Sequence, residues 1–125
     1  MNKGICTRIR IGEEIQKWKN RKGYLKTSVT LMDVCEELGI NRTYMSNFIN
    51  EKYRKNFNTW INGLRVKEAI RIIHNNPHIP LGEVGQKVGY TDLAHFSKQF
   101  KLNTGIAPSS WRKENIQRKK RSLSS

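Results

Sequence analysis

The sequence has few of the features that mark secreted, membrane-spanning or catalytic proteins. Among its 125 residues are only two cysteines, Cys6 and Cys35, which are too few for a disulfide framework and favour a reducing cytoplasm. No stretch approaches the roughly 20 consecutive apolar residues of a membrane span, and the basic first residues lack the apolar core of a signal peptide. No nucleophile is paired with a base, and no glycine-rich phosphate loop is present. We therefore expect a cytoplasmic protein that is not an enzyme.

Residues that bind metals are also few and poorly arranged. His74 and His78 are four residues apart, but Pro77 lies between them and no carboxylate is near them in the sequence. Cys35 lies in an apolar helical pattern, where core packing is the usual role of a free cysteine. We therefore expect neither a metal site nor a cofactor.

Acidic residues are scarce, because 10 Asp and Glu stand against 24 Lys and Arg, which gives a formal net charge of +14. A chain with this charge repels itself, so the excess indicates a polyanionic partner. Nucleic acid is the first candidate, and an anionic membrane surface is the second. The apolar fraction of 36% is low but sufficient for thin helical layers, in one compact domain or two very small ones.

The spacing of apolar and capping residues predicts an all-α fold. Thr30 and Asp33 have the spacing of a capping pair, and Gly39 supplies the end of the helix that they begin. After a very short turn, Asn41 can cap a second helix. Residues 57–75 form a longer helix whose apolar residues are not confined to one stripe, which is typical of a helix buried from several sides.

The two ends of that long helix are flanked by similar segments. The stretch "VCEELGI" at residues 34–40 matches "VGQKVGY" at 84–90, an offset of 50. Beyond the turn the offset is 51, so that residues 44–46 match residues 95–97. Two short helices joined by a glycine turn make a helix-turn-helix, and its repetition indicates two copies of one unit.

The second copy resembles a known family. Residues 89–112, "GYTDLAHFSKQFKLNTGIAPSSWR", are similar to the C-terminal signature of the AraC/XylS-type bacterial transcription regulators, and "GINRTYMSNFIN" at 39–50 is similar to the first half of the same domain. The resemblance covers roughly residues 12–114. The signature positions are filled by Gly89, Tyr90, His95, Phe96, Ser97, Lys98, Phe100, Lys101, Gly105, Pro108, Trp111 and Arg112.

The resemblance implies two helix-turn-helix subdomains joined by a long linker helix, about seven helices in all. The expected parts are a basic N-terminal segment (1–11), the first helix-turn-helix subdomain (12–56), the linker helix (57–76), the second subdomain (77–114) and a basic flexible tail (115–125).

It also implies sequence-specific binding of double-stranded DNA and transcription regulation, with the second helix of each subdomain in successive major grooves. RNA polymerase is the protein partner that this implies, and a sensor or dimerisation domain N-terminal to the region is expected to be absent from this chain. The base-facing positions carried over are Arg42, Thr43, Ser46, Asn47 and Asn50 in the first subdomain, and Leu93, Ala94, Ser97 and Lys98 in the second.

The chemistry of these two sets differs. Asn47 can pair with adenine and Lys98 with guanine, whereas Leu93 and Ala94 offer only apolar contact, for instance to a thymine methyl group. We therefore expect the first subdomain to carry more of the hydrogen-bonded base readout. A nonspecific nucleic-acid-binding module is the alternative, and the repeat of two groove-reading helices disfavours it.

Some positions depart from the family pattern. Pro80 and Gly85 stand where a capping hydroxyl and an alanine are usual, and an interior glycine costs about 1 kcal/mol of helix stability. We therefore expect residues 81–88 to form the least stable helix. Arg54 replaces the glycine that matches Gly105, so a left-handed turn there would be mildly strained.

Overall fold

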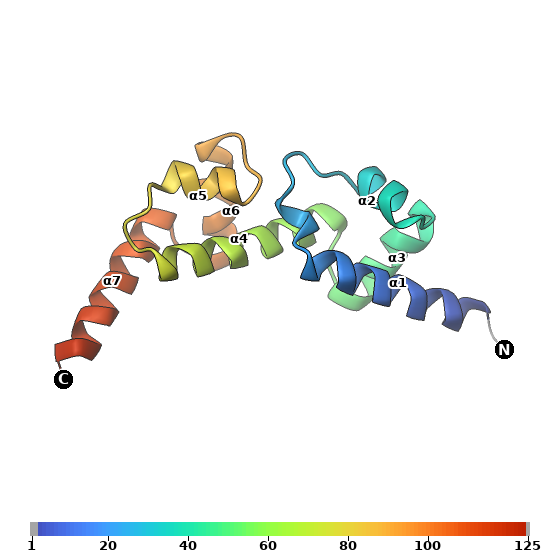
Figure 1. Ribbon diagram of the computed structural model, residues 1–125, viewed down its shortest axis with the longest axis horizontal. Coiled ribbons are helices and arrows are strands. Elements are labelled where there is room, and N and C mark those ends of the chain that lie inside the picture. The colour runs from blue at the N-terminus through green and yellow to red at the C-terminus, as the bar shows by residue number, and fades with distance from the viewer. Residues whose placement is uncertain (1–2, 125) are drawn as a thin grey trace. The chain divides into compact units, whose positions relative to one another are not determined.

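The computed structural model describes the backbone of residues 3–124 and the side chains of residues 7–121, and this part of the chain is helical with no strand (Figure 1). The all-α prediction with about seven helices is confirmed. The elements are α1 (Lys3–Asn20), the 3-10 helix η1 (Gly23–Leu25), α2 (Leu31–Leu38), α3 (Arg42–Tyr53), α4 (Phe57–Asn75), α5 (Leu81–Lys87), α6 (Leu93–Thr104) and α7 (Pro108–Ser124).

These helices form two compact units, which divide within α4. The N-terminal unit is Met1–Asn62 and the C-terminal unit is Gly63–Ser125. The first part of α4 therefore packs with α1, α2 and α3, and the rest of it belongs with α5, α6 and α7. Each unit has its own buried core, so each is described separately.

The core of the N-terminal unit is built on one face of α1. Ile11, Ile15 and Trp18 lie along this face, and each is only 1% exposed. The Trp18 ring stacks on that of Trp60 from α4, with ring centres 5.9 Å apart. Burial of three large side chains at this spacing fixes α1 as the base on which the first helix-turn-helix packs.

The first helix-turn-helix begins and ends where local signals predict. The Thr30 hydroxyl accepts a hydrogen bond from the Asp33 amide at 3.1 Å, and the Asp33 carboxylate accepts one from the Thr30 amide at 3.0 Å. Gly39 ends α2 in the left-handed region with φ 65°. The Asn41 side chain then accepts a hydrogen bond from the Thr43 amide at 2.8 Å and begins α3. The predicted capping pair, stop and cap are all confirmed.

The C-terminal unit repeats this arrangement with a different capping residue. Val84 of α5 and Phe96 and Phe100 of α6 are fully buried in its core. Asp92 caps α6 by accepting a hydrogen bond from the Ala94 amide at 2.8 Å. As predicted, Pro80 begins α5 without a side-chain hydrogen bond.

Helix α1 starts at Lys3, within the N-terminal segment of residues 1–11, and α7 continues to Ser124 where we expected a flexible tail at 115–125. Both of these segments make tertiary contacts. Arg8 forms an ion pair with Glu51 of α3 at 2.8 Å. Near the other end of the chain, the Lys119 ammonium donates a hydrogen bond to the carbonyl of His74, at the end of α4. Both helices therefore make contacts with other elements outside the region in which apolar periodicity indicated a helix.

Candidate nucleic-acid interface

Helix α3 presents a polar face opposite its buried one. Met45, Phe48 and Ile49 are buried, and at 100° per residue the positions furthest from them are Thr43, Asn47 and Asn50 and their neighbours. The five predicted positions are therefore brought together on one helix. Arg42, Thr43, Asn47 and Asn50 are exposed, and Ser46 is half-buried.

Helix α6 presents the second predicted set in the same register. Leu93 is 52% exposed, Ala94 and Lys98 are exposed, and Ser97 is half-buried like its counterpart in α3. Phe96 forms the opposite, buried side of the helix. Because the two sets have matching exposures at an offset of 51 residues, the units present equivalent surfaces with different chemistry.

Two exposed cations on these surfaces were not among the residues predicted to contact DNA. Lys101 lies in the register of Asn50 and is exposed, and the offset of 51 was a sufficient signal to find it. Arg54 is exposed at the C-terminal end of α3 and has a φ of 57°, so the left-handed turn considered at this position is present. Both residues carry the charge that phosphate contacts require.

The turns between the helices begin with the same backbone hydrogen bond in both units. The Ile40 amide donates to the Cys35 carbonyl at 3.0 Å, and the equivalent Tyr90 amide donates to the Gly85 carbonyl at 2.9 Å. The preceding glycine of each turn has a positive φ. The two turns therefore begin in the same way, as expected for a repeated helix-turn-helix, and the second is one residue longer because Thr91 lies between Tyr90 and the cap Asp92.

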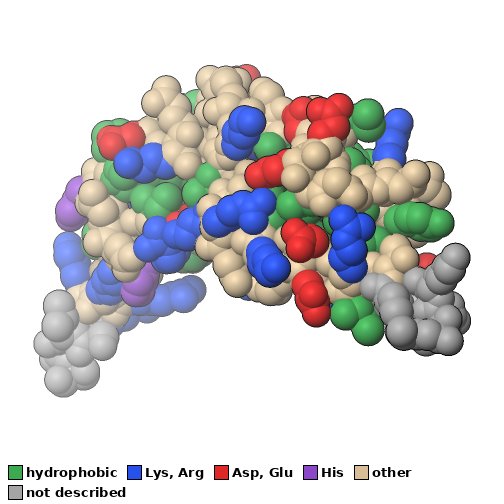
Figure 2. All heavy atoms as spheres, turned by 45° about the vertical axis from the view of Figure 1, so that its right-hand side comes forward, with side chains coloured by type: hydrophobic (Ala, Val, Ile, Leu, Met, Phe, Trp, Pro, Cys, Tyr) green, Lys and Arg blue, Asp and Glu red, His purple; other side chains and the backbone are tan. Residues whose placement is uncertain are grey.

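Basic side chains outnumber acidic ones in the sequence, which indicates an anionic partner. Figure 2 shows Lys and Arg side chains over both units, with Asp and Glu gathered mainly over the N-terminal unit on this face. Burial raises the pKa of the Cys35 thiol, which keeps it protonated and inert. Among the described residues, no three His, Cys, Asp or Glu side chains come together as a metal site would need. Because Cys35 is buried, it is a core residue, as predicted.

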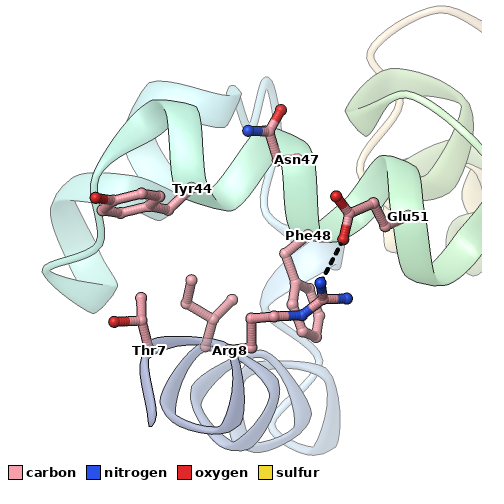
Figure 3. A pocket seen from close by; sticks show the side chains of 7 residues that line it. Thr7, Arg8, Tyr44, Asn47, Phe48 and Glu51 are labelled. Atoms are coloured by element: carbon pink, nitrogen blue, oxygen red, sulfur yellow. Dashed lines mark ion pairs between the residues drawn. The ribbon is translucent and has the colours of Figure 1, made fainter. Parts of the chain in front are cut away.

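A cavity of about 250 Å³ borders the α3 surface within the N-terminal unit. Figure 3 shows Thr7 and Arg8 of α1 on one side and Tyr44, Asn47 and Glu51 of α3 on the other, with the Arg8–Glu51 ion pair across the opening. Ile11 and Phe48 form its apolar floor. Helix α1 therefore lies directly beside the helix that carries the first set of predicted contacts.

Comparison with known proteins shows a family match over most of the chain. A model described as "Helix-turn-helix domain" matches residues 34–114. The chain is 28% identical over 88 residues to the Msm operon regulatory protein of Streptococcus mutans, and 29% identical over 87 residues to the raffinose operon transcriptional regulatory protein RafR of Pediococcus pentosaceus. Each match covers 70% of this chain and 31% of the relative. The chain thus spans about a third of the length of these curated relatives.

Solved structures show the same fold. The C-terminal domain of AraT, a response regulator from Geobacillus stearothermophilus, superposes with a TM-score of 0.74 at 23% identity over 84% of each chain. An AraC-type transcriptional regulator from Chromobacterium violaceum superposes with a TM-score of 0.72 at 15% identity, over 90% of this chain and 97% of that one. Within residues 3–124, no helix is both long and apolar enough to cross a bilayer. The chain belongs to the AraC-type helix-turn-helix family, which is a family of DNA-binding transcription regulators.

Proposed function

We propose that this chain binds double-stranded DNA sequence-specifically and regulates transcription, with α3 and α6 each lying in a major groove. The observation that carries the proposal is the repeated, capped helix-turn-helix in which each second helix buries one face and exposes the other. An α-helix fits the major groove, where each base pair presents a distinct pattern of donors and acceptors. Two such helices in one chain fit two half-sites about one helical turn apart.

The exposed residues divide between base contacts and phosphate contacts. Asn47 has the amide that pairs with adenine, and Lys98 has a donor for guanine. Leu93 and Ala94 are suited to thymine methyl groups. Lys101 and other surface cations supply sequence-independent contacts to phosphates, which give most of the affinity but no sequence preference.

The whole regulator requires more than this chain. The family relatives are about three times longer than the matched region, so a sensor or dimerisation portion outside this chain is part of the proposal. RNA polymerase is the proposed protein partner, because an operon regulator acts by changing the use of a promoter. The proposed location is the cytoplasm, where bacterial DNA is found.

Selection of bound sequences from random duplex DNA tests the proposal. We expect two half-motifs whose centres lie about 10 base pairs apart. If about 6–10 phosphates are contacted, affinity should fall roughly 10³- to 10⁵-fold between about 50 and 200 mM salt. Random DNA at the same salt concentration is the control. Equal affinity for selected and random DNA would favour the nonspecific nucleic-acid-binding module instead.

Single substitutions then test the residues. Asn47→Ala and Lys98→Ala should each reduce discrimination at one base position by about 1–3 kcal/mol, because one base edge loses its hydrogen-bonding partner. Thr59→Ala, an exposed position on α4 outside both sets, is the control. If both variants weakened binding equally for all sequences, Asn47 and Lys98 would be phosphate contacts and not specificity determinants.

A further inference from the structure

The internal repeat extends beyond the two helix-turn-helix motifs to the helix that supports each one. Residues 10–18 of α1, "RIGEEIQKW", align without a gap with residues 65–73 of α4, "RVKEAIRII", at an offset of 55. Ile11 and Trp18 are buried in the N-terminal unit, and the equivalent Val66 and Ile73 are buried in the C-terminal unit. Each unit is therefore a three-helix repeat that starts with an arginine at the same position of its supporting helix.

In the N-terminal unit this arginine contacts the turn of the helix-turn-helix. The Arg10 guanidinium donates a hydrogen bond through Nη2 to the carbonyl of Gly39 at 3.2 Å, across 29 positions of sequence. Gly39 is the left-handed residue that ends α2. Carbonyl groups at a helix end have no partner within the helix, so a side-chain donor there fixes the conformation of the turn.

In the C-terminal unit the equivalent arginine contacts the equivalent turn. Arg65 is only 6% exposed, and its guanidinium carbon lies 5.1 Å from the centre of the Tyr90 ring. The Arg65 guanidinium and the Tyr90 hydroxyl also interact electrostatically, and this interaction favours the charged form of each group. Tyr90 directly follows the turn residue Gly89, whose φ is 96°. Tyr90 occupies the position of Ile40 in the other unit, so the two arginines reach adjacent positions of the same turn.

We propose that Arg10 and Arg65 are equivalent positioning residues that set the angle at which α3 and α6 are presented to DNA. Each joins a supporting helix to the turn that a recognition helix follows directly. At ~1.5 Å per residue α3 extends roughly 18 Å from its turn, so a small rotation at the turn displaces Asn47 and Asn50 from their bases. A guanidinium suits this role because its planar donors hold a fixed geometry. The inference rests on the proposed function.

The test compares each arginine with a lysine on the same helix. Arg10→Met is paired with Lys17→Met on α1, and Arg65→Met is paired with Lys67→Met on α4, so that each pair removes one charge. Binding is measured to the selected site and to versions with one half-site scrambled. Arg10→Met should lower discrimination at the α3 half-site roughly 5- to 100-fold, the effect of about one mismatched base pair, and spare the other half-site. Arg65→Met should do the reverse.

The salt dependence separates positioning from direct contact with DNA. A positioning residue leaves the affinity for random DNA and the salt slope the same as in its lysine control. If Arg10→Met instead weakens all sequences uniformly and reduces the salt slope by about one relative to Lys17→Met, Arg10 is a phosphate contact and the proposal is overturned. Arg10→Lys, which keeps a charge and a donor, should restore part of the lost discrimination.

Replacing the buried Arg65 leaves a cavity, so a second variant tests its role without creating one. Tyr90→Phe keeps the ring and removes only the hydroxyl that Arg65 contacts. It should reduce discrimination at the α6 half-site alone, by less than Arg65→Met does. If folded Tyr90→Phe and Arg10→Met both keep full preference at both half-sites, the proposal is overturned. Failure of the proposed function would be seen separately, as a wild-type chain without any sequence preference.

Discussion

The two helix-turn-helix units differ in how the buried side-chain volume is divided between their two helices. In the N-terminal unit, α2 contributes Cys35 and α3 contributes Met45, and both are buried. In the C-terminal unit the equivalent positions hold Gly85 and Phe96. A Cβ atom added to Gly85 would lie 3.2 Å from Cγ of the Phe96 ring, so the ring occupies the space that a side chain on α5 would need. One backbone thus accepts either a pair of medium side chains or a glycine with a large ring, since close packing constrains the summed volume.

The exposed surfaces of the units differ in a second way. The α3 surface carries an asparagine pair and a threonine, whereas the α6 surface begins with Leu93 and Ala94 and ends with lysines. Amide groups discriminate bases by paired hydrogen bonds, while apolar groups recognise mainly the thymine methyl group. We therefore expect the N-terminal unit to carry the finer base readout.

The largest expected effect is the loss of the Phe96 ring. Phe96→Ala should destabilise the C-terminal unit by about 3–5 kcal/mol, because a fully buried ring leaves a cavity, and Met45→Ala should cost the N-terminal unit about 2–5 kcal/mol. Native-state hydrogen exchange measures each unit. Phe96→Ala should speed exchange in α5 and α6, and Met45→Ala in α2 and α3. Equal loss of protection in both units after either substitution would show that they unfold together.

The turn of the C-terminal unit should be the more sensitive one at alkaline pH. Burial raises the pKa of Tyr90 from its usual value near 10 to about 12, whereas Ile40 at the equivalent position cannot ionise. Between these pH values the unfolded chain loses the proton and the folded chain keeps it. Stability is therefore unaffected by Tyr90 below pH 10 and falls by about 2–3 kcal/mol as the pH rises to about 12.

Denaturant unfolding at a series of pH values measures this effect. Burial also raises the pKa of Tyr53, so only the difference between variants isolates Tyr90. Tyr90→Phe should lose less stability between pH 10 and 12 than the wild type does. Tyr44→Phe, which changes an exposed tyrosine on α3, is the matched control and should follow the wild type. Parallel curves for all three proteins would contradict the assignment.

Substitution of Gly85 and of Gly82, both in α5, should change the stability of the protein in opposite directions. Gly85→Ala places a Cβ against Phe96 and should destabilise the C-terminal unit by about 1–3 kcal/mol. Gly82→Ala meets no atom within 4 Å and should stabilise α5 by about 1 kcal/mol. Combining Gly85→Cys with Phe96→Met copies the N-terminal unit, and it should be more stable than the sum of the two single changes predicts. If Gly85→Ala stabilised the protein as Gly82→Ala does, helix propensity alone would control this position.

Local signals in the sequence were sufficient for most of the fold. The caps at Thr30 and Asn41 and the helix end at Gly39 depend on neighbouring residues only, and all were predicted. The ends of α1 and α7 lie in polar segments without apolar periodicity, where contacts join distant residues, such as that of Lys119 with the His74 carbonyl. Periodicity contains no information about such contacts.

The candidate site was predictable where it follows the repeat. Exposure of Asn47 and Lys98 follows from the buried face of each helix, and the offset of 51 was sufficient to add Lys101, which the prediction omitted. Gly85 was interpreted as a weakness of α5, whereas the structure shows that it accommodates Phe96. That relation is between two helices, and it is seen only when the volumes at both positions are compared.

The smallest expected effect concerns the ends of the two recognition helices. The Arg54 amide donates to the Asn50 carbonyl at 3.0 Å, and the Gly105 amide donates to the Lys101 carbonyl at 2.8 Å, so the two helices end in the same way. Arg54 has a φ of 57° and Gly105 a φ of 89°. A residue with a side chain is strained in this left-handed region, and a glycine is not.

Exchanging these two residue types reverses the difference. Arg54→Gly should stabilise the N-terminal unit by about 1 kcal/mol, and Gly105→Ala should destabilise the C-terminal unit by a similar amount. An added Cβ at Gly105 meets no atom within 4 Å, so the cost there comes from the backbone alone. Thermal unfolding measures both changes. If Arg54→Gly is more stable but binds all DNA more weakly with a salt slope smaller by about one, the arginine is kept at the end of α3 for a phosphate contact, and its backbone strain is a consequence of that role.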